Sequence, residues 1–370
     1  MVYRETLFFI GRCLSLRQHP EHLPEIREVL KSGKLVWEQL LWISSSQLVL
    51  PALFINLRYR HLLSEMPADL VEHMTQLHKM TVRRNDAIMA QVEDINEVLA
   101  RNGIKPIYIK GVAHYLDGLY VDAGERMLGD IDFLLPPEDL FRAVEILKEL
   151  GYKNRDTFFE DMLTSERHFP RLINPDLLGA VEIHWQSVAS SYSGEFSFER
   201  INRDKKLSKK DRRAFVMSGH HQLIQTMMNM PVYSDLLRLG QMDLKHQYDL
   251  FLLSGKNNSL EAVKEFGYYP DLLNAQLFTA SKIFGEPSGI KFFESRKAER
   301  YFRRLDFLFQ HQGWQSFIYK LQFFTRHLIQ YICLPVRSLY SKSARRTLVS
   351  RVGNPSWYKK HLQSYKKLFS

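Results

Sequence analysis

The chain has 370 residues and a formal net charge of +10, with 45% hydrophobic, 25% charged and 12% aromatic residues. This composition is that of a globular protein, and it excludes disorder as the dominant state. The positive charge is concentrated at the C-terminal end, because residues 281–370 hold 18 Lys and Arg against 4 Asp and Glu. The net charge is therefore no evidence about the chemistry of the rest of the chain.

Neither a disulfide framework nor a membrane span is expected. The two cysteines, Cys13 and Cys333, are too few for a disulfide scaffold or a cysteine-rich metal site. The apolar run at residues 7–11 is too short for the core of a signal peptide. Charged residues and a proline interrupt the most apolar late stretch, residues 322–340, so it lacks the ~20 apolar residues that cross a bilayer. We expect a cytoplasmic protein.

Helices are predicted first along the chain, followed by strands. Apolar residues recur at helical spacing up to residue 102. The apolar run at residues 104–109 then predicts a buried strand, and a brief helix is expected over residues 112–120. Residues 127–135 predict a second strand, and residues 136–151 a helix that opens on two prolines and closes on a glycine.

The next segments predict an antiparallel pair of strands and then a return to helix. Residues 169–173 and 180–185 are the two strands, joined across the turn-forming Asn174-Pro175-Asp176. The Lys-rich segment at residues 202–213 is interpreted as a solvated linker. The pattern after residue 212 is helical.

These elements predict an α+β protein that is mostly helical, with a small mixed sheet between helical N- and C-terminal blocks. Four units are expected in chain order: an N-terminal helical block (1–102), an α/β core (103–200), a helical domain (201–290) and a basic helical C-terminal region (291–370).

Carboxylates inside two apolar strands are the strongest chemical signal. Asp130 and Asp132 are separated by one residue, so in a strand they point to one face, with Cα atoms ~7 Å apart. Glu182 and His184 likewise share a face of a second strand. If the two strands are neighbours, Glu182 completes a cluster of three carboxylates, which favours Mg²⁺ or Mn²⁺. Two such ions are the usual clamp for in-line displacement at phosphorus.

Basic residues and glycines precede the carboxylates. Lys110 and Gly111 lie between a predicted strand and a predicted helix, where free N–H groups and the lysine charge can hold phosphate oxygens. Arg126 stands shortly before the aspartates and could neutralise charge on the phosphates. With Gly129, these residues are the candidate nucleotide contacts.

The series from Lys110-Gly111 through Gly129-Asp130-Ile131-Asp132 to Glu182-Ile183-His184-Trp185 resembles the uncharacterised bacterial nucleotidyltransferase family of the DNA polymerase beta superfamily. The resemblance covers residues 104–190, with a weaker likeness at His220-His221 and Tyr248-Asp249-Leu250. It implies that Asp130 and Asp132 bind the metal, that Glu182 is the third carboxylate and that Lys110-Gly111 forms the phosphate-holding turn. The wider superfamily has glycine-serine where this chain has lysine-glycine.

These residues suggest a Mg²⁺-dependent nucleotidyltransferase that moves an NMP from an NTP to an unidentified hydroxyl acceptor. One alternative is a glycosyltransferase that uses Asp-x-Asp to hold Mn²⁺ and a nucleotide-sugar, although it would need a larger parallel sheet ahead of the motif. Another is a non-catalytic protein that binds nucleotide or nucleic acid.

Structural readings of the same residues remain open. Glu182 could pair with a buried arginine, and Arg126 could pair with Asp130 or Asp132. His184 could contact substrate, or it could be a core histidine bonded to a neighbouring carboxylate and thus support the site indirectly. The C-terminal region suits nucleic acid or an anionic membrane surface, or it packs its aromatic residues inward. Those aromatic residues are Tyr319, Phe323, Phe324, Tyr331, Tyr340, Trp357, Tyr358 and Tyr365.

Overall fold

The computed structural model describes residues 1–154, 167–189, 192–229, 242–285 and 289–340, together with the pairs 344–345, 348–349 and 358–359. Within these residues the protein is mostly helical and has one mixed sheet of seven short strands. The predicted α+β class, a small sheet between helical blocks, is confirmed.

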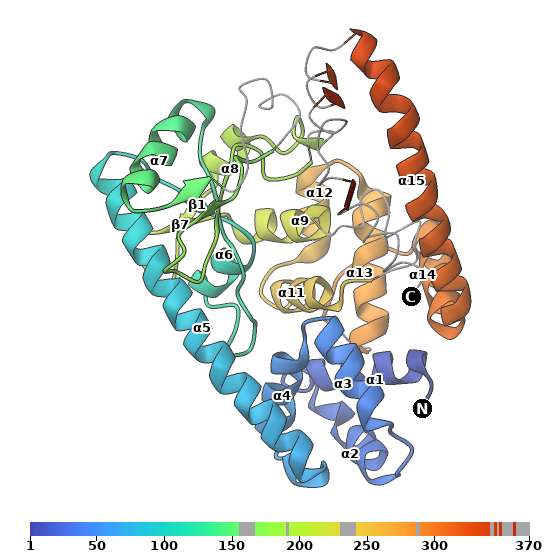
Figure 1. Ribbon diagram of the computed structural model, residues 1–370. Helices are drawn as coiled ribbons and strands as arrows, with labels where there is room; N and C mark the ends of the chain where they lie inside the picture. Colours follow the sequence, from blue (N-terminus) through green and yellow to red (C-terminus); the bar gives the residue numbers. More distant parts are fainter. Residues whose placement is uncertain are drawn as a thin grey trace.

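Five α-helices and two short 3₁₀ turns (Pro20–His22 and Leu63–Glu65) form the N-terminal block. The helices are α1 (Tyr3–Ser15), α2 (Leu23–Lys31), α3 (Trp37–Ser46), α4 (Leu50–Tyr59) and α5 (Ala68–Arg101). Helix α5 runs along one side of the molecule from this block to the sheet (Figure 1). Its buried residues, among them Ile88, Val92, Ile95 and Leu99, recur at three-to-four spacing, as an amphipathic helix requires.

The sheet has the strand order β3-β4-β5-β2-β1-β7-β6. Its strands are β1 (Ile107–Tyr108), β2 (Ile131–Leu134), β3 (Lys153–Asn154), β4 (Leu172–Ile173), β5 (Val181–His184), β6 (Lys206–Leu207) and β7 (Phe215–Val216). The central pair, β2 and β5, is parallel and wholly buried, with Asp132 opposite Glu182 in register. The condition for a shared carboxylate cluster, adjacent strands, is therefore met.

Several predicted boundaries shift. The strand expected over residues 104–109 is reduced to β1, and the helix expected over residues 112–120 is α6, which begins earlier, at Lys110, and ends at Leu116. Strand β4 pairs with β5 in an antiparallel sense, which confirms the predicted hairpin. The interpretation of residues 202–213 as a solvated linker is wrong in part, because β6 lies there and pairs with β7 at the edge of the sheet.

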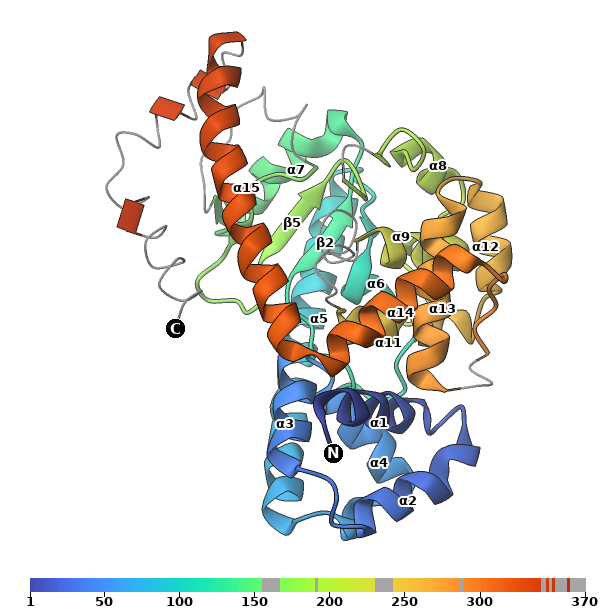
Figure 2. The ribbon, with the colours of Figure 1, turned by 90° about the vertical axis from the view of Figure 1, so that its right-hand side faces the viewer.

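The remaining helices are α7 (Pro137–Glu149), α8 (Phe198–Arg203), α9 (Gly219–Asn229), α11 (Leu244–Ser254), α12 (Ser259–Phe266), α13 (Pro270–Phe284), α14 (Arg296–Gln310) and α15 (Gln312–Tyr340). Helix α6 packs between β2 and α9, and α1 packs on α13. Helix α15 extends away from the helices around α13 (Figure 2).

The inward packing considered for the C-terminal aromatics is not found for Phe324, Tyr340 and Tyr358, which are 51%, 86% and 45% exposed. Trp357 and Tyr365 lie outside the described residues. No helix among the described residues is long and apolar enough to cross a membrane. Binding of nucleic acid or an anionic membrane surface by this region stays a prediction.

Helix α1 meets α13 at Gly11, where a Cβ would lie 2.3 Å from the carbonyl oxygen of Ile283. Because that atom belongs to the backbone, we expect Gly11→Ala to lower the free energy of unfolding by about 1–3 kcal/mol. A Cβ at Gly313 in α15 would meet no atom within 4 Å. Gly313→Ala should therefore leave stability unchanged or raise it by up to ~1 kcal/mol. Urea denaturation of both variants tests the contrast, and equal effects would contradict it.

Candidate active site

Two carboxylates and one imidazole converge at the centre of the sheet. Asp132 and Glu182 are only 7% and 8% exposed, and His184 is fully buried two residues beyond Glu182 on the same face of β5. The His184 Nε2 atom lies 2.9 Å from Asp132 Oδ1 and 3.5 Å from Glu182 Oε2. These three residues each offer a potential metal-ligand atom within 4.8 Å of the others. The sequence analysis left the role of His184 open between substrate contact and support of a carboxylate, and the structure places its imidazole directly beside both buried carboxylates.

Lys110 provides the nearest positive charge. Its Nζ atom lies 2.5 Å from Asp132 Oδ1 and 3.7 Å from Glu182 Oε2. The backbone of Lys110 has φ +56°, a left-handed conformation that is strained for a residue with a side chain, and its N–H donates to Gln225 Oε1 at 3.2 Å. Strained residues of this kind cluster at active sites, where the surrounding structure holds them in place.

Asp130 lies just ahead of β2 and is held by Arg171, which the sequence analysis missed. One guanidinium nitrogen, Arg171 Nη2, lies 2.9 Å from Asp130 Oδ2 and 2.7 Å from Glu182 Oε1. The structural reading that Glu182 pairs with an arginine is therefore confirmed, but this arginine is partly exposed and not buried. Among the described residues, Asp130 is not part of the close group formed by Asp132, Glu182 and His184.

The surroundings shift the pKa values of the three carboxyl groups in different directions. Burial opposes ionisation of Asp132, but Lys110 and the hydrogen bond from His184 outweigh it and lower the pKa. Glu182 is also buried, and His184, Lys110 and Arg171 together hold its pKa well below the usual range. Burial and the neighbouring carboxylates raise the pKa of Asp130, despite Arg171. Asp132 and Glu182 are therefore ionised at neutral pH.

Arg126 pairs with neither candidate aspartate, so that structural reading is wrong. Its Nη2 atom lies 3.0 Å from Oδ2 of Asp249 in α11, and both side chains are buried. The Tyr120 hydroxyl donates to the other carboxylate oxygen of Asp249 at 2.8 Å. Burial disfavours the charge on Arg126, but Asp249 more than compensates and raises the pKa of the guanidinium.

His114 lies beside this ion pair, with Nδ1 3.8 Å from Asp249 Oδ2. Burial lowers the pKa of His114 to about 4, and the charge of Asp249 only partly offsets this. In the unfolded chain histidine takes up a proton below about pH 6.5. Between these two values the unfolded state binds more protons, so stability falls as the pH falls through this window.

We expect His114 to account for about 2 kcal/mol of the stability lost between pH 7 and pH 5. His114→Gln should reduce that loss, measured by urea denaturation at both pH values. His22, His168 and His221 also have lowered pKa values, so part of the dependence of stability on pH will remain in the variant. An unchanged slope in His114→Gln would show that this residue is not buried as a neutral imidazole.

The predicted nucleotide contacts border one cleft of about 530 Å³. Lys110, Gly111, Arg126 and Gly129 line it together with Asp130 and Asp132, and so do three basic residues that the sequence did not single out, Arg84, Lys245 and His246. A Cβ at Gly129 would meet no atom within 4 Å, whereas one at Gly111 would lie 3.4 Å from Leu128. Sterics therefore do not require glycine at position 129. The cleft combines carboxylates with a basic wall that suits a polyphosphate.

Comparison with known proteins adds one match. A family model described as an uncharacterised nucleotidyltransferase matches residues 33–264, a range that contains every residue of the cleft and extends beyond residues 104–190 on both sides. No curated protein and no solved structure was found to match the chain.

Proposed function

Because the chain belongs to the uncharacterised nucleotidyltransferase family, we propose that it transfers an NMP from an NTP to a hydroxyl group of an acceptor, with release of pyrophosphate. The observation that carries this proposal is the ionised pair Asp132 and Glu182, of which Asp132 lines a basic cleft. The hydroxyl oxygen would bond to the α-phosphorus while the bond to the bridging oxygen breaks, and the hydroxyl proton would pass to solvent. NTPs are cytoplasmic metabolites, so we place the reaction in the cytoplasm.

The donor atoms fit a divalent cation. Carboxylate oxygens of Asp132 and Glu182 are the ligands that Mg²⁺ and Mn²⁺ prefer. We propose that Asp130, which shares the Arg171 guanidinium with Glu182, is a further ligand. We propose that His184 orients the two buried carboxylates through Nε2. When bound, the cation would neutralise charge on the phosphates.

The basic side chains of the cleft would bind and orient the triphosphate. The cleft that contains the aspartates is also bordered by Lys110, Gly111, Arg126 and Gly129. Arg126 is fixed by Asp249 before substrate arrives, so holding a phosphate in place would need little rearrangement. Arg84 and Lys245 add further positive charge to the wall.

Calorimetric titration distinguishes this function from a glycosyltransferase. We expect ATP or another NTP to bind in the presence of Mg²⁺ or Mn²⁺, and EDTA to abolish the heat of binding. Preferential binding of a nucleotide-sugar would favour the glycosyltransferase, although the N-terminal block is helical and the sheet is small and mixed. NTP binding with no transfer of label from α-³²P-NTP to any acceptor would favour a non-catalytic nucleotide-binding protein.

A further inference from the structure

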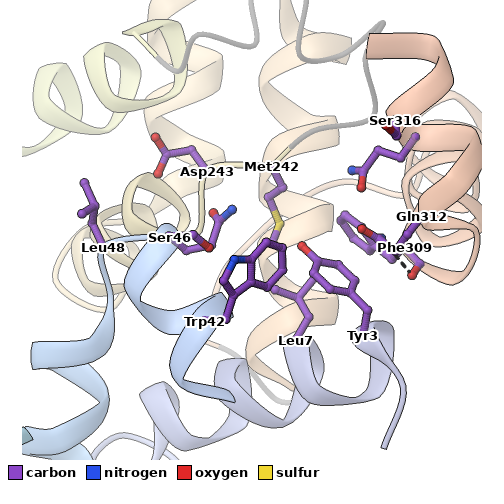
Figure 3. A pocket seen from close by; sticks show the side chains of 12 residues that line it. Tyr3, Leu7, Trp42, Ser46, Leu48, Met242, Asp243, Phe309, Gln312 and Ser316 are labelled. Atoms are coloured by element: carbon purple, nitrogen blue, oxygen red, sulfur yellow. Dashed lines mark hydrogen bonds between the residues drawn. The ribbon is translucent and has the colours of Figure 1, made fainter. Parts of the chain in front are cut away.

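A second cavity of about 440 Å³ lies between the N-terminal block and the C-terminal helices, and we call it the aromatic pocket. It is defined by Tyr3 of α1, Trp42 of α3, Leu48 after α3, Asp243 before α11, Phe309 of α14 and Gln312 of α15 (Figure 3). Segments far apart in the sequence thus build one site. Its volume is that of a small-molecule site.

Aromatic rings form one wall of the pocket. The rings of Tyr3 and Trp42 meet edge to face with centroids 6.2 Å apart, and those of Tyr3 and Phe309 lie 6.4 Å apart. Trp42 is 60% exposed, which is unusual for the largest apolar side chain. An exposed indole that packs on the Tyr3 ring, which in turn packs on Phe309, is a platform for the apolar face of a ring-shaped ligand.

The rest of the described lining combines apolar residues (Leu7, Leu48 and Met242) with polar ones, and none of these described residues is basic. Amide and hydroxyl side chains are present, including those of Gln312 and Ser316. Among the described residues that line the pocket, Asp243 is the one with a formal charge. The hydrogen bond from His246 outweighs burial and lowers the pKa of Asp243 to about 2, so it is an anion at neutral pH. Such a lining disfavours a phosphate group and suits hydroxyl or ammonium groups.

The aromatic pocket adjoins the cleft of the active site. Leu48 lines both cavities, is 43% exposed and has φ +55°, a strained backbone conformation. Gln47 Oε1 fixes this turn to α11 by accepting a hydrogen bond from the backbone N–H of Leu244 at 2.8 Å. His246, which lines the cleft, lies 2.7 Å from Asp243 through Nδ1. A cleft with a basic wall and an aromatic pocket therefore meet at Leu48 and at the Asp243–His246 pair.

We propose that the aromatic pocket binds the hydroxyl acceptor, and that this acceptor is an uncharged or amine-bearing sugar. The inference rests on the proposed function, because it divides the substrates of that reaction between the two cavities. The apolar face of the sugar ring lies on Trp42, its hydroxyl groups meet the amide and hydroxyl side chains, and an amine is attracted to Asp243. A nucleic acid acceptor does not fit, because its phosphates would meet no basic side chain among the described lining residues.

Saturation-transfer NMR on the full chain tests this without requiring catalysis. The probes are N-acetylglucosamine, glucosamine and glucose 6-phosphate at millimolar concentration, each with the wild type, Trp42→Ala and Trp42→Phe. The matched control is Trp314→Ala, because Trp314 is 57% exposed and does not line the pocket. We expect the first two sugars to give signals that Trp42→Ala weakens at least tenfold and that Trp42→Phe and Trp314→Ala largely retain. Any signal from glucose 6-phosphate should be unaffected by Trp42→Ala.

Three results would overturn the assignment: no signal from either uncharged or amine-bearing sugar, equal signals in the wild type and Trp42→Ala, or weaker ATP binding in Trp42→Ala with sugar signals intact. The last result would make the pocket a nucleoside site. Calorimetry with NTP on the same proteins separates the two proposals. In the wild type, normal NTP binding without sugar signals removes the acceptor assignment alone, whereas sugar signals without any NTP binding remove the proposed transfer reaction and leave the sugar site.

Discussion

Asp132→Asn should lower the rate of NMP transfer by about 1,000-fold or more, because it removes a buried carboxylate that would hold the cation, and with it the positive charge that would neutralise the phosphates. Asparagine keeps the shape of the aspartate side chain, and its amide oxygen can still accept a hydrogen bond from His184. Lys110 keeps Glu182 as a partner at 3.7 Å and is partly exposed, so the fold should survive. Transfer of label from α-³²P-NTP measures the rate, and circular dichroism verifies the fold.

A matched variant shows whether the loss is specific. Asp176→Asn makes the same chemical change in the exposed turn between β4 and β5. It should leave the transfer rate unchanged. Binding of Mn²⁺, measured by calorimetry, should weaken in Asp132→Asn and stay unchanged in Asp176→Asn. Wild-type transfer by folded Asp132→Asn would remove Asp132 from the proposed reaction.

Local patterns in the sequence predicted the central strands and the face that carries the carboxylates. Two-residue alternation predicted that Glu182 and His184 share a face, and the apolar flanks predicted that both strands are buried. The predicted turn across residues 174–176 also contained a missed signal. With Leu172 paired to Val181, the hairpin register places Arg171 opposite Glu182, so counting outward from the turn would have found this partner.

Other features had no local signal. Arg126 and Asp249 are 123 positions apart. The family likeness included residues 248–250, but no pattern in either segment indicates that these two residues pair beside the cleft. Strands β6 and β7 have two residues each, too few for a periodic pattern, and the lysines around β6 are typical of a solvated segment and of an edge strand alike. The aromatic pocket is built from residues of α1, α3, α14 and α15 and of the segments just after α3 and just before α11, so only the tertiary structure reveals it.

Asp249→Asn should lower the free energy of unfolding by about 3–5 kcal/mol, since it leaves the guanidinium of Arg126 buried without its counter-charge. Tyr120 donates to the same carboxylate, so its hydrogen bond is perturbed as well. Urea denaturation measures the loss. The matched control is Asp271→Asn, whose partner Lys297 is 73% exposed at the side chain, and it should change stability by less than about 0.5 kcal/mol.

The double variant Arg126→Met/Asp249→Leu separates the structural part of this ion pair from its part in substrate binding. Replacing both charges with apolar side chains removes the unpaired group, so the double variant should recover at least half of the stability lost in Asp249→Asn. NTP binding by the double variant should remain weaker than in the wild type, because the proposed phosphate contact of Arg126 is gone. If the double variant is as unstable as Asp249→Asn, the lost stability is due to packing and not to the unpaired charge. A double variant with wild-type NTP affinity would limit Arg126 to supporting the fold.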